Sequence, residues 1–208
     1  MKSQLIAGFI KPVQQTDWVA NVVPDPKKDG KVRMCIDFWD LNKVCPKDDL
    51  PLSHINVLVD NTIGSALMSF MDVFSGFNQI KMAPKDTTKT TFVIEWGIYC
   101  YTIMPFWLKN ARETYQRMAI ALLHDMMHKE VKVYVENMIV KSNTREGHPI
   151  NLQKFFEQIK KYQLRLNPQK CAFLSNRGIE VELGKVKAIL EMPLLRNEKE
   201  IRGFLGRL

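Results

Sequence analysis

The order of the predicted elements indicates an α+β fold built around an antiparallel sheet. From residue 66 onward the sequence predicts a strand, an inserted hairpin, a helix, a second hairpin, a helix and a strand. That order is the split βαβ, ferredoxin-like pattern, with helices on one face of the sheet. With 208 residues, 46% of them hydrophobic and 25% charged, the chain is long enough to bury the core of such a sheet.

The N-terminal part predicts a short helix and a hairpin. Residues 4–8 are typical of the end of a helix that a glycine closes. Residues 18–23 and 31–37 predict two strands, joined by a basic turn at 24–30. A serine at the start of residues 53–58 could cap a further short helix.

The middle of the chain predicts a buried strand and then a hairpin. Residues 66–73 are nearly continuously apolar, and their acid is Asp72. Residues 90–95 and 98–104 predict the two strands of the hairpin, with its turn at residues 96–97.

Helical spacing dominates the remaining segments. Residues 109–129 contain neither proline nor glycine and place large apolar side chains at helical intervals. Residues 152–162 repeat apolar side chains with the same period and predict a second helix. A strand is expected at residues 164–167, and short helices are expected at 185–191 and 197–208.

The second hairpin is the most informative segment. Residues 130–141 alternate between apolar and other side chains, and the polar pair Glu136–Asn137 interrupts them at the midpoint. This pattern predicts a tight turn at that pair. Because the split βαβ pattern places its first strand beside the central hairpin, we expect Asp72 and Glu136 to meet at one edge of the sheet.

Charge and cysteine content narrow the class of protein. The net charge of +8 and the pI of about 9.3 favour polyanionic partners, although many ordinary proteins share such values. The four cysteines, Cys35, Cys45, Cys100 and Cys171, lack the spacing of a zinc cluster. No membrane span and no signal peptide are evident, so we expect a cytoplasmic or nuclear protein with reduced thiols.

Four segments carry a family likeness, namely residues 34–42, 70–80, 104–110 and 134–137. Their order and spacing resemble the motifs of the reverse transcriptase, an RNA-directed DNA polymerase, in the Pol polyprotein of gypsy-type long-terminal-repeat retrotransposons, especially plant elements. The likeness runs from about residue 5 to the end of the chain. It implies that the partners are an RNA or DNA primer–template and deoxynucleotides, and that the cofactor is Mg²⁺.

The resemblance also implies a right-hand polymerase with fingers and palm. Residues 1–65 would then be the first part of the fingers, and residues 84–107 would be the fingers hairpin. Residues 66–83 and 108–173 would form the palm, and residues 174–208 would be a truncated remnant of the thumb or connection.

The metal site implied by the resemblance is altered. The family motif is Tyr-X-Asp-Asp, and this chain has Tyr134-Val135-Glu136-Asn137. Asp72 is similar to the first metal-binding aspartate, Glu136 stands at the second and Asn137 at the third, so the implied metal ligands are Asp72 and Glu136. Asp72 taken alone could be an ordinary acid at the end of a strand.

Both substitutions weaken the predicted site. Glutamate adds one methylene, about 1.5 Å of reach, and a misplacement of about 1 Å can lower a rate on the order of 100-fold. Asn137 keeps an oxygen but loses a charge. We therefore expect weak Mg²⁺ binding and little or no DNA synthesis.

The resemblance implies further residues that contact the nucleotide. Phe77 matches the aromatic residue beside the sugar 2′ position, and Arg33 matches the arginine that contacts the triphosphate. Lys27 or Lys28 matches the fingertip lysine, and Phe106 lies where the family lines the nucleotide pocket. On charge alone, the basic residues could equally be a solvated hairpin tip.

Three further features depart from the family pattern. Trp107 replaces a glycine beside the incoming nucleotide, where an indole would fill the pocket, displace the turn or point into solvent. Trp39 replaces an arginine and could be a simple exposed side chain. After Phe173, residues 174–176 lead directly into residues 177–181, without the hairpin that resembles the primer grip.

Three hypotheses follow from these features. The chain could be a degenerate, inactive polymerase domain, a non-catalytic nucleic-acid-binding module, or a weakly active polymerase. The four departures disfavour the third hypothesis.

Overall fold

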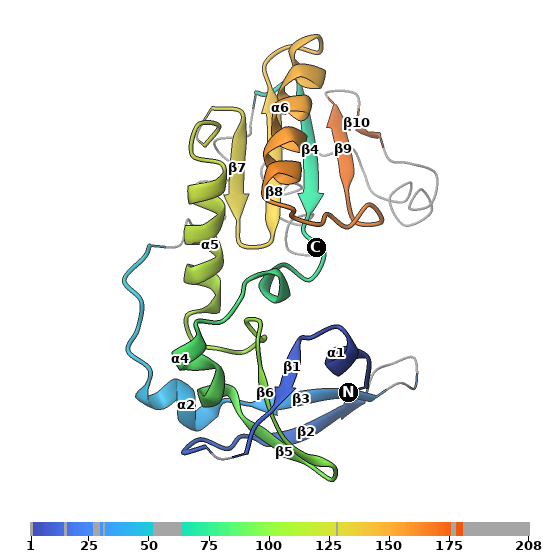
Figure 1. The fold of residues 1–208 in the computed structure, drawn as a ribbon. Helices are drawn as coiled ribbons and strands as arrows, with labels where there is room; N and C mark the ends of the chain where they lie inside the picture. The colour runs from blue at the N-terminus through green and yellow to red at the C-terminus, as the bar shows by residue number, and fades with distance from the viewer. Residues whose placement is uncertain are drawn as a thin grey trace. The chain divides into compact units, whose positions relative to one another are not determined.

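A computed structural model of the chain describes residues 2–14, 16–26, 30, 32–51, 64–127, 129–175 and 178–180 (Figure 1). The chain divides into two compact units. The first unit comprises Met1–Asp49 and Ser75–Arg112, and the second comprises Leu50–Phe74 and Glu113–Leu208.

The first unit consists of short strands and short helices. Its strands are β1 (Ile10–Pro12), β2 (Asn21–Pro26), β3 (Val32–Asp37), β5 (Phe92–Ile94) and β6 (Gly97–Tyr101). Its helices are α1 (Lys2–Ile6), α2 (Trp39–Val44) and α4 (Pro84–Thr87), with 3₁₀ turns η1 (Gly76–Gln79) and η2 (Thr88–Thr90). The strands form a three-stranded sheet in the order β1-β6-β5 and a two-stranded ribbon of β2 and β3. The predicted N-terminal helix and its glycine closure are confirmed, since Gly8 has a φ of 70°.

A small aromatic and aliphatic core holds the first unit together. Its buried members are Ile10, Ile36, Phe38 and Phe92. They come from β1, from β3, from the residue before α2, and from β5. This core therefore joins the ribbon to the three-stranded sheet.

The predicted ribbon is confirmed, but its first strand lies further along the chain than expected. β2 begins at Asn21 and runs through Pro24 and Pro26, which the sequence had placed in the turn. Both prolines pair in register with β3, opposite Met34 and Val32. Proline is tolerated here because a strand at the edge of a sheet has nitrogens that need no partner.

The turn of the next hairpin also lies one residue earlier than predicted. Ile94 pairs with Gly97, so the turn consists of Glu95 and Trp96. Gly97 has a φ of 137° and begins β6. An L side chain rarely adopts that backbone conformation, so glycine suits this strand position.

The second unit is a five-stranded antiparallel sheet with two long helices. Its strands are β4 (Leu67–Asp72), β7 (Val131–Tyr134), β8 (Asn137–Ser142), β9 (Ala172–Ser175) and β10 (Gly178–Glu180). Its helices are α5 (Ala111–Leu122), which starts in the first unit, and α6 (Gly147–Lys161). The strand order is β10-β9-β4-β8-β7, with every pair antiparallel. The predicted split arrangement is confirmed, because β4 lies beside the central hairpin.

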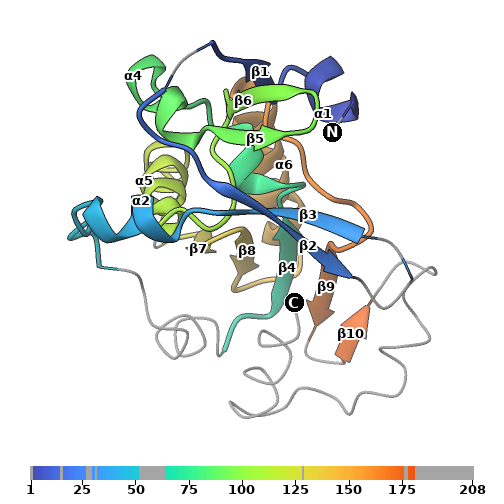
Figure 2. The same cartoon turned by 90° about the horizontal axis from the view of Figure 1, so that it is seen from below.

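Both helices cover the same face of this sheet (Figure 2). At the start of α6, the buried His148 ring contacts two serine hydroxyls, Ser69 Oγ in β4 at 2.7 Å and Ser142 Oγ in β8 at 2.9 Å. Asn151 donates to the same Ser142 hydroxyl at 2.8 Å. A polar joint therefore fixes the helix to two neighbouring strands.

Two predictions in this unit were wrong in detail. α5 ends at Leu122 rather than near residue 129, because the chain turns back through Met126, whose carbonyl accepts from the Val131 amide at 3.0 Å. Residues 164–167 form no full strand, and Leu166 makes only an isolated bridge to Val73. The strand that was predicted there, after the second helix, is instead β9.

Some predictions lie outside the described residues, namely the helices at 53–58, 185–191 and 197–208. In the part of the chain that the structure describes, no helix is both long and apolar enough to span a membrane.

Candidate active site

The β7–β8 hairpin carries the altered motif at its tip. Tyr134 pairs with Asn137, so the turn consists of Val135 and Glu136. The predicted hairpin is confirmed, but its turn lies one residue earlier than the expected Glu136–Asn137 pair. Asn137 is the first residue of β8 and has strand partners on both sides, Tyr134 in β7 and Asp72 in β4. Val135 has a φ of 50°, a position for which such turns prefer glycine.

One buried amide holds this unfavourable turn. Gln116 in α5 is 4% exposed. Its Nε2 donates to the Val133 carbonyl at 3.3 Å, and its Oε1 accepts from the Val135 amide at 3.2 Å. No local pattern in the sequence indicates this role for Gln116, because only the packing of α5 against the hairpin creates it.

The structure brings the three predicted catalytic residues together. Asp72 ends β4 directly opposite Asn137, and the Val73 amide donates to the Glu136 carbonyl at 3.3 Å. Directly opposed residues of antiparallel strands place their side chains on the same face of the sheet. The expectation that Asp72 and Glu136 meet at one edge is therefore confirmed for their backbones.

Two residues that local sequence pattern does not single out interact with the carboxylates. Burial, followed by the charges of Glu136 and Asp72, raises the pKa of the Tyr115 hydroxyl well above its ordinary value, so Tyr115 keeps its proton. Lys170 Nζ lies 3.5 Å from Asp72 Oδ2. Neither contact follows from local pattern, since both depend on tertiary packing.

The donor atoms of this site are of the kind that a hard cation binds. Asp72 and Glu136 offer carboxylate oxygens, and Asn137 offers an amide oxygen. Protein sites for Mg²⁺ use one or two carboxylates together with water and substrate phosphates. Within the described ranges, no group of three or more His, Cys, Asp or Glu side chains could hold a metal ion.

The first unit contains the predicted aromatic residues of the nucleotide pocket. Phe77 is buried in η1, and Phe106 is exposed. Their rings meet edge to face, with centroids 5.3 Å apart and an interplanar angle of 89°. The structure therefore joins these two predicted residues in one contact.

Trp107 points into solvent and does not fill a pocket. Its side chain is 70% exposed, and its φ is 74°. The backbone thus keeps the left-handed conformation that glycine would favour at this position. Of the placements considered for the indole, the structure has the solvent-exposed one.

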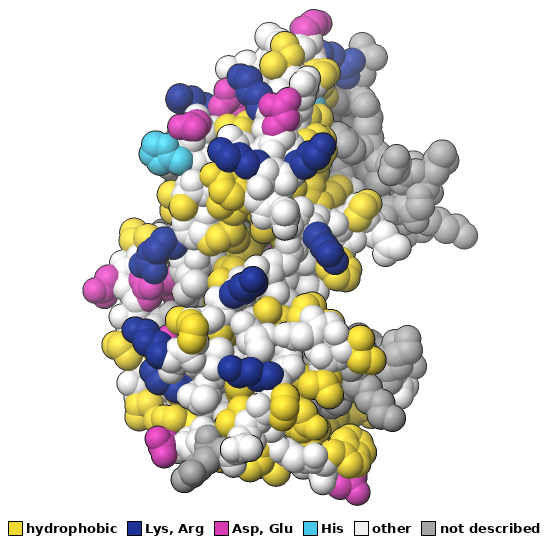
Figure 3. Space-filling view, in the orientation of Figure 1, with side chains coloured by type: hydrophobic (Ala, Val, Ile, Leu, Met, Phe, Trp, Pro, Cys, Tyr) yellow, Lys and Arg dark blue, Asp and Glu magenta, His cyan; other side chains and the backbone are white. Residues whose placement is uncertain are grey.

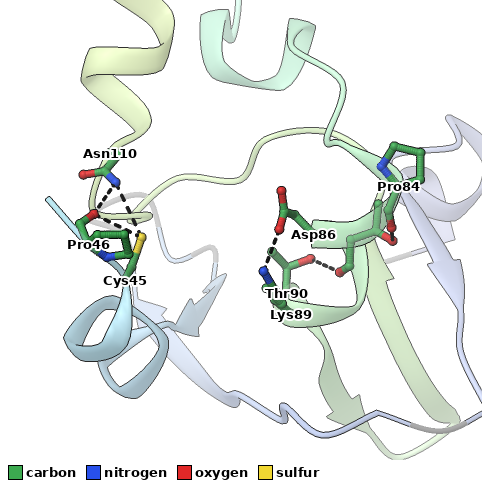
Figure 4. A network of polar contacts seen from close by, with 8 residues as sticks. Cys45, Pro46, Pro84, Asp86, Lys89, Thr90 and Asn110 are labelled. Atoms are coloured by element: carbon green, nitrogen blue, oxygen red, sulfur yellow. Dashed lines mark hydrogen bonds and ion pairs between the residues drawn. The ribbon is translucent and has the colours of Figure 1, made fainter. Parts of the chain in front are cut away.

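Two asparagines hold the turn around Trp107. Asn42 in α2 donates to the Trp107 carbonyl at 2.7 Å and accepts from the Lys109 amide at 2.8 Å. In the opposite direction, Asn110 donates to the Pro46 carbonyl at 2.8 Å and accepts from the Asp48 amide at 3.1 Å. Figure 4 shows Asn110 facing Cys45 and Pro46, and beside them the contacts of Pro84, Asp86, Lys89 and Thr90.

The remaining predicted residues are exposed or outside the described residues. Arg33 is exposed on β3, where it pairs in register with Asp25. Trp39 is 66% exposed at the start of α2, with the Lys43 ammonium 5.3 Å from its ring. Lys27 and Lys28 lie outside the described residues.

The predicted deletion after Phe173 adjoins a regular strand pair. β9 and β10 are antiparallel, with Ser175 opposite Gly178. The strands on either side of the place of the predicted deletion are therefore paired with each other, and the deletion itself stays a prediction. Whether the missing segment supplied a primer grip stays a prediction.

Comparison with known protein families identifies the class of this chain. Residues 25–206 match the family model of the reverse transcriptases, described as RNA-dependent DNA polymerases. The chain belongs to this family.

Particular relatives are transposon polyproteins. The chain is 31% identical over 213 residues to the retrovirus-related Pol polyprotein from transposon 297 of Drosophila melanogaster, a match that covers 97% of this chain and 20% of that protein. It is 32% identical to the corresponding polyprotein from transposon opus, covering 99% of this chain and 22% of that protein. The Transposon Tf2-7 polyprotein of Schizosaccharomyces pombe is 26% identical over 87% of this chain and 14% of its own length. The chain thus spans about a fifth of the length of the first two.

Solved structures share the fold. The foamy viral protease-reverse transcriptase in complex with an RNA/DNA hybrid has a TM-score of 0.75 at 20% identity, covering 99% of this chain and 29% of that one. The same enzyme in complex with double-stranded DNA has a TM-score of 0.74 at 21% identity, covering 99% of this chain and 45% of that one. At this level of identity, the likeness establishes a mixed α+β fold of the reverse transcriptase kind.

Proposed function

We propose that this chain is the reverse transcriptase domain of a gypsy-type long-terminal-repeat retrotransposon, related to plant elements, and that it is catalytically inactive. The observation that carries the proposal is the pairing of Asp72 with Asn137 across adjacent strands. An amide stands where the family motif has its third carboxylate. The other acid of the hairpin, Glu136, lies in the turn and is one methylene longer than aspartate.

The division of the chain into two compact units supports fingers and palm, although residues 75–83, which the family pattern assigns to the palm, lie in the first unit. We propose that residues 1–65 and 84–107 belong to the fingers, and that residues 66–83 and 108–173 belong to the palm. The five-stranded sheet with helices on one face supports the palm assignment. The aromatic pair Phe77 and Phe106 supports a nucleotide pocket in the first unit.

The proposed loss of activity follows from charge and reach. When bound, two Mg²⁺ ions would activate the primer 3′-hydroxyl and stabilise the leaving pyrophosphate. Asp72 and Glu136 would hold them, with Asn137 as a neutral oxygen donor. Losing one carboxylate lowers the charge available to two dications, and a ligand misplaced by about 1 Å lowers a rate on the order of 100-fold.

Primer extension on an RNA template tests this proposal directly. The unaltered chain, the repaired chain (Glu136→Asp with Asn137→Asp) and an Asp72→Asn control are compared in Mg²⁺ and in Mn²⁺. We expect no product from the unaltered chain or from the control. Product from the repaired chain alone would assign the defect to the metal ligands. Product from the unaltered chain that Asp72→Asn abolishes would refute inactivity.

A second candidate function is nucleic-acid binding without catalysis. The net charge of +8 and the exposed Arg33 on the β2–β3 ribbon favour it. Figure 3 shows lysine and arginine side chains spread over the drawn face of both units. Binding carried by such residues weakens steeply as salt increases.

Fluorescence anisotropy with a labelled primer–template at several salt concentrations tests for this function. Arg33→Gln should weaken binding and flatten the salt dependence. Arg145→Gln, which removes an exposed arginine of the second unit, is the matched control and should do neither. Binding that ignores salt would exclude this candidate.

A further inference from the structure

Asp72 has a cationic neighbour that belongs to the protein itself. Lys170 Nζ lies 3.5 Å from Asp72 Oδ2. The Asp72 side chain is only 12% exposed, whereas that of Lys170 is 53% exposed. A carboxylate so far removed from water is costly unless a cation or hydrogen-bond donors compensate it.

Backbone contacts carry the lysine to this position. The Asn167 amide donates to the carbonyl of Asp72 itself at 2.9 Å, and the Asn167 carbonyl accepts from the Lys170 amide at 3.0 Å. The Asn167 side chain accepts from the Gln169 amide at 3.2 Å. Next to Asp72, the Phe74 amide donates to the Arg165 carbonyl at 2.9 Å. The turn that bears Lys170 is thus fixed to the end of β4 at Asp72 and again at Phe74.

The residue opposite Asp72 adds no charge to the site. Asn137, directly across from Asp72, carries no charge. The site therefore holds the carboxylates of Asp72 and Glu136, and the Lys170 ammonium lies beside the first of them. That ammonium supplies to Asp72 a positive charge that a divalent ion would otherwise bring.

We propose that Lys170 is the resident cation of this site: its ammonium occupies the position at Asp72 that a divalent ion would need, so that the two cations compete. Lys170 can have this role only if the proposed function holds for these residues, since it concerns the same carboxylates. The long and half-exposed lysine side chain can swing away into solvent when a divalent ion binds. The protein then keeps its fold without metal and binds metal weakly.

Titration with Mn²⁺, followed by the loss of the free-ion signal in electron paramagnetic resonance, measures the competition. Lys170→Gln should bind Mn²⁺ about tenfold more tightly, because it removes an ammonium that lies 3.5 Å from Asp72 Oδ2 and repels an incoming cation. Lys170→Arg keeps the cation and should match the unaltered chain. Lys160→Gln removes an exposed lysine of α6 and is the matched control. Equal or weaker Mn²⁺ binding by Lys170→Gln would overturn the inference.

Thermal melting in the presence of EDTA supplies a second and independent readout. Lys170→Gln should melt at a lower temperature than the unaltered chain, and Mn²⁺ should restore more of its stability than it adds to the unaltered chain. If Lys170→Gln does not fold, the double variant Asp72→Asn with Lys170→Gln removes both charges and should fold. A double variant that melts as low as Lys170→Gln would contradict a charge role for Lys170.

These readouts separate this inference from the proposed function. Primer extension by the unaltered chain would refute inactivity while leaving a tenfold gain in Mn²⁺ affinity intact. An unchanged affinity would refute the role of Lys170 while leaving inactivity intact.

Discussion

Two turns, one in each unit, hold a residue with a side chain at positive φ, one in a buried and one in an exposed setting. The hairpin tip of the second unit places Val135 at a φ of 50°, and the turn of the first unit places Trp107 at 74°. Both residues are poorly suited to this left-handed region. In each case a single amide side chain bonds the turn on both sides, Gln116 in the first case and Asn42 in the second. An amide can do this because it carries a donor and an acceptor in one rigid group.

The difference between the two lies in access to water. Gln116 is buried, whereas the hydrogen bonds of Asn42 lie at the surface. Water can replace a surface hydrogen bond, but an unpaired group in the interior loses its partner altogether. The amide of Gln116 should therefore contribute more to the free energy of unfolding than the amide of Asn42.

The largest effect is expected from Gln116→Met, which keeps the volume of the side chain and removes both hydrogen bonds. Urea unfolding should show a loss of about 2–3 kcal/mol, because the Val133 carbonyl and the Val135 amide lose a buried partner. Gln116→Glu keeps the acceptor but turns a buried carboxylate oxygen toward the Val133 carbonyl, so it should lose at least as much. A loss of unfolding free energy smaller than that of the surface variant Asn42→Ala would contradict the conclusion that the buried amide stabilises its turn more.

A pH effect confined to the second unit is expected next. Burial lowers the pKa of His148 below its ordinary value. Above about pH 6.5 the ring is neutral in both the folded and the unfolded chain, and its protonation contributes nothing to the pH dependence of stability. As the pH falls below that value, His148 binds a proton in the unfolded chain but not in the folded chain. Stability therefore falls until the pH reaches the pKa of His148 in the folded chain.

Unfolding free energies measured from pH 7.5 to pH 5 check this expectation. The contribution of His148 has a limiting slope of about 1.4 kcal/mol per pH unit. His148→Gln should flatten the profile in this window. His124→Gln, at an exposed histidine, should leave it unchanged. Equal flattening by both variants would assign the effect to the overall charge of the protein and not to the burial of His148.

Trp107→Gly should stabilise the first unit by about 1 kcal/mol, because glycine adopts a left-handed backbone without the steric cost of a side chain. Trp107→Ala is the matched control, since it removes the exposed indole but keeps the Cβ atom. Thermal melting should rank glycine above tryptophan and alanine. If alanine stabilises as much as glycine, the indole is the source of the effect and the backbone is not.

The smallest effect is expected from Asn42→Ala. Water can take over both of its surface hydrogen bonds, so the loss should be about 0.5–1 kcal/mol in urea unfolding. Asn42→Asp keeps only the acceptor to the Lys109 amide, so its unfolding free energy should lie between those of the unaltered chain and of Asn42→Ala. A loss as large as that of Gln116→Met would remove the contrast between buried and exposed amides.

The sequence predicted the strands that carry the site better than the exact turn and the side chains that contact it. Short-range alternation identified β4 and the β7–β8 hairpin, and the split βαβ order brought Asp72 to the hairpin. The observed turn lies one residue earlier than predicted, because the prediction followed the polar pair Glu136–Asn137, whereas the structure places Val135 in the turn at positive φ. Gln116 and Lys170 were missed, because each acts across a distance in sequence that no local pattern spans.

The prolines of β2 have a consequence for the behaviour of the protein in concentrated solution. In a strand, every second residue directs its N–H to the same edge. Ala20 uses that edge to donate to the Thr91 carbonyl at 2.7 Å. Pro24 and Pro26 follow on the same edge and have no N–H to offer. A strand from another molecule would find too few donors there to extend the ribbon, which protects this open edge against fibre-like association.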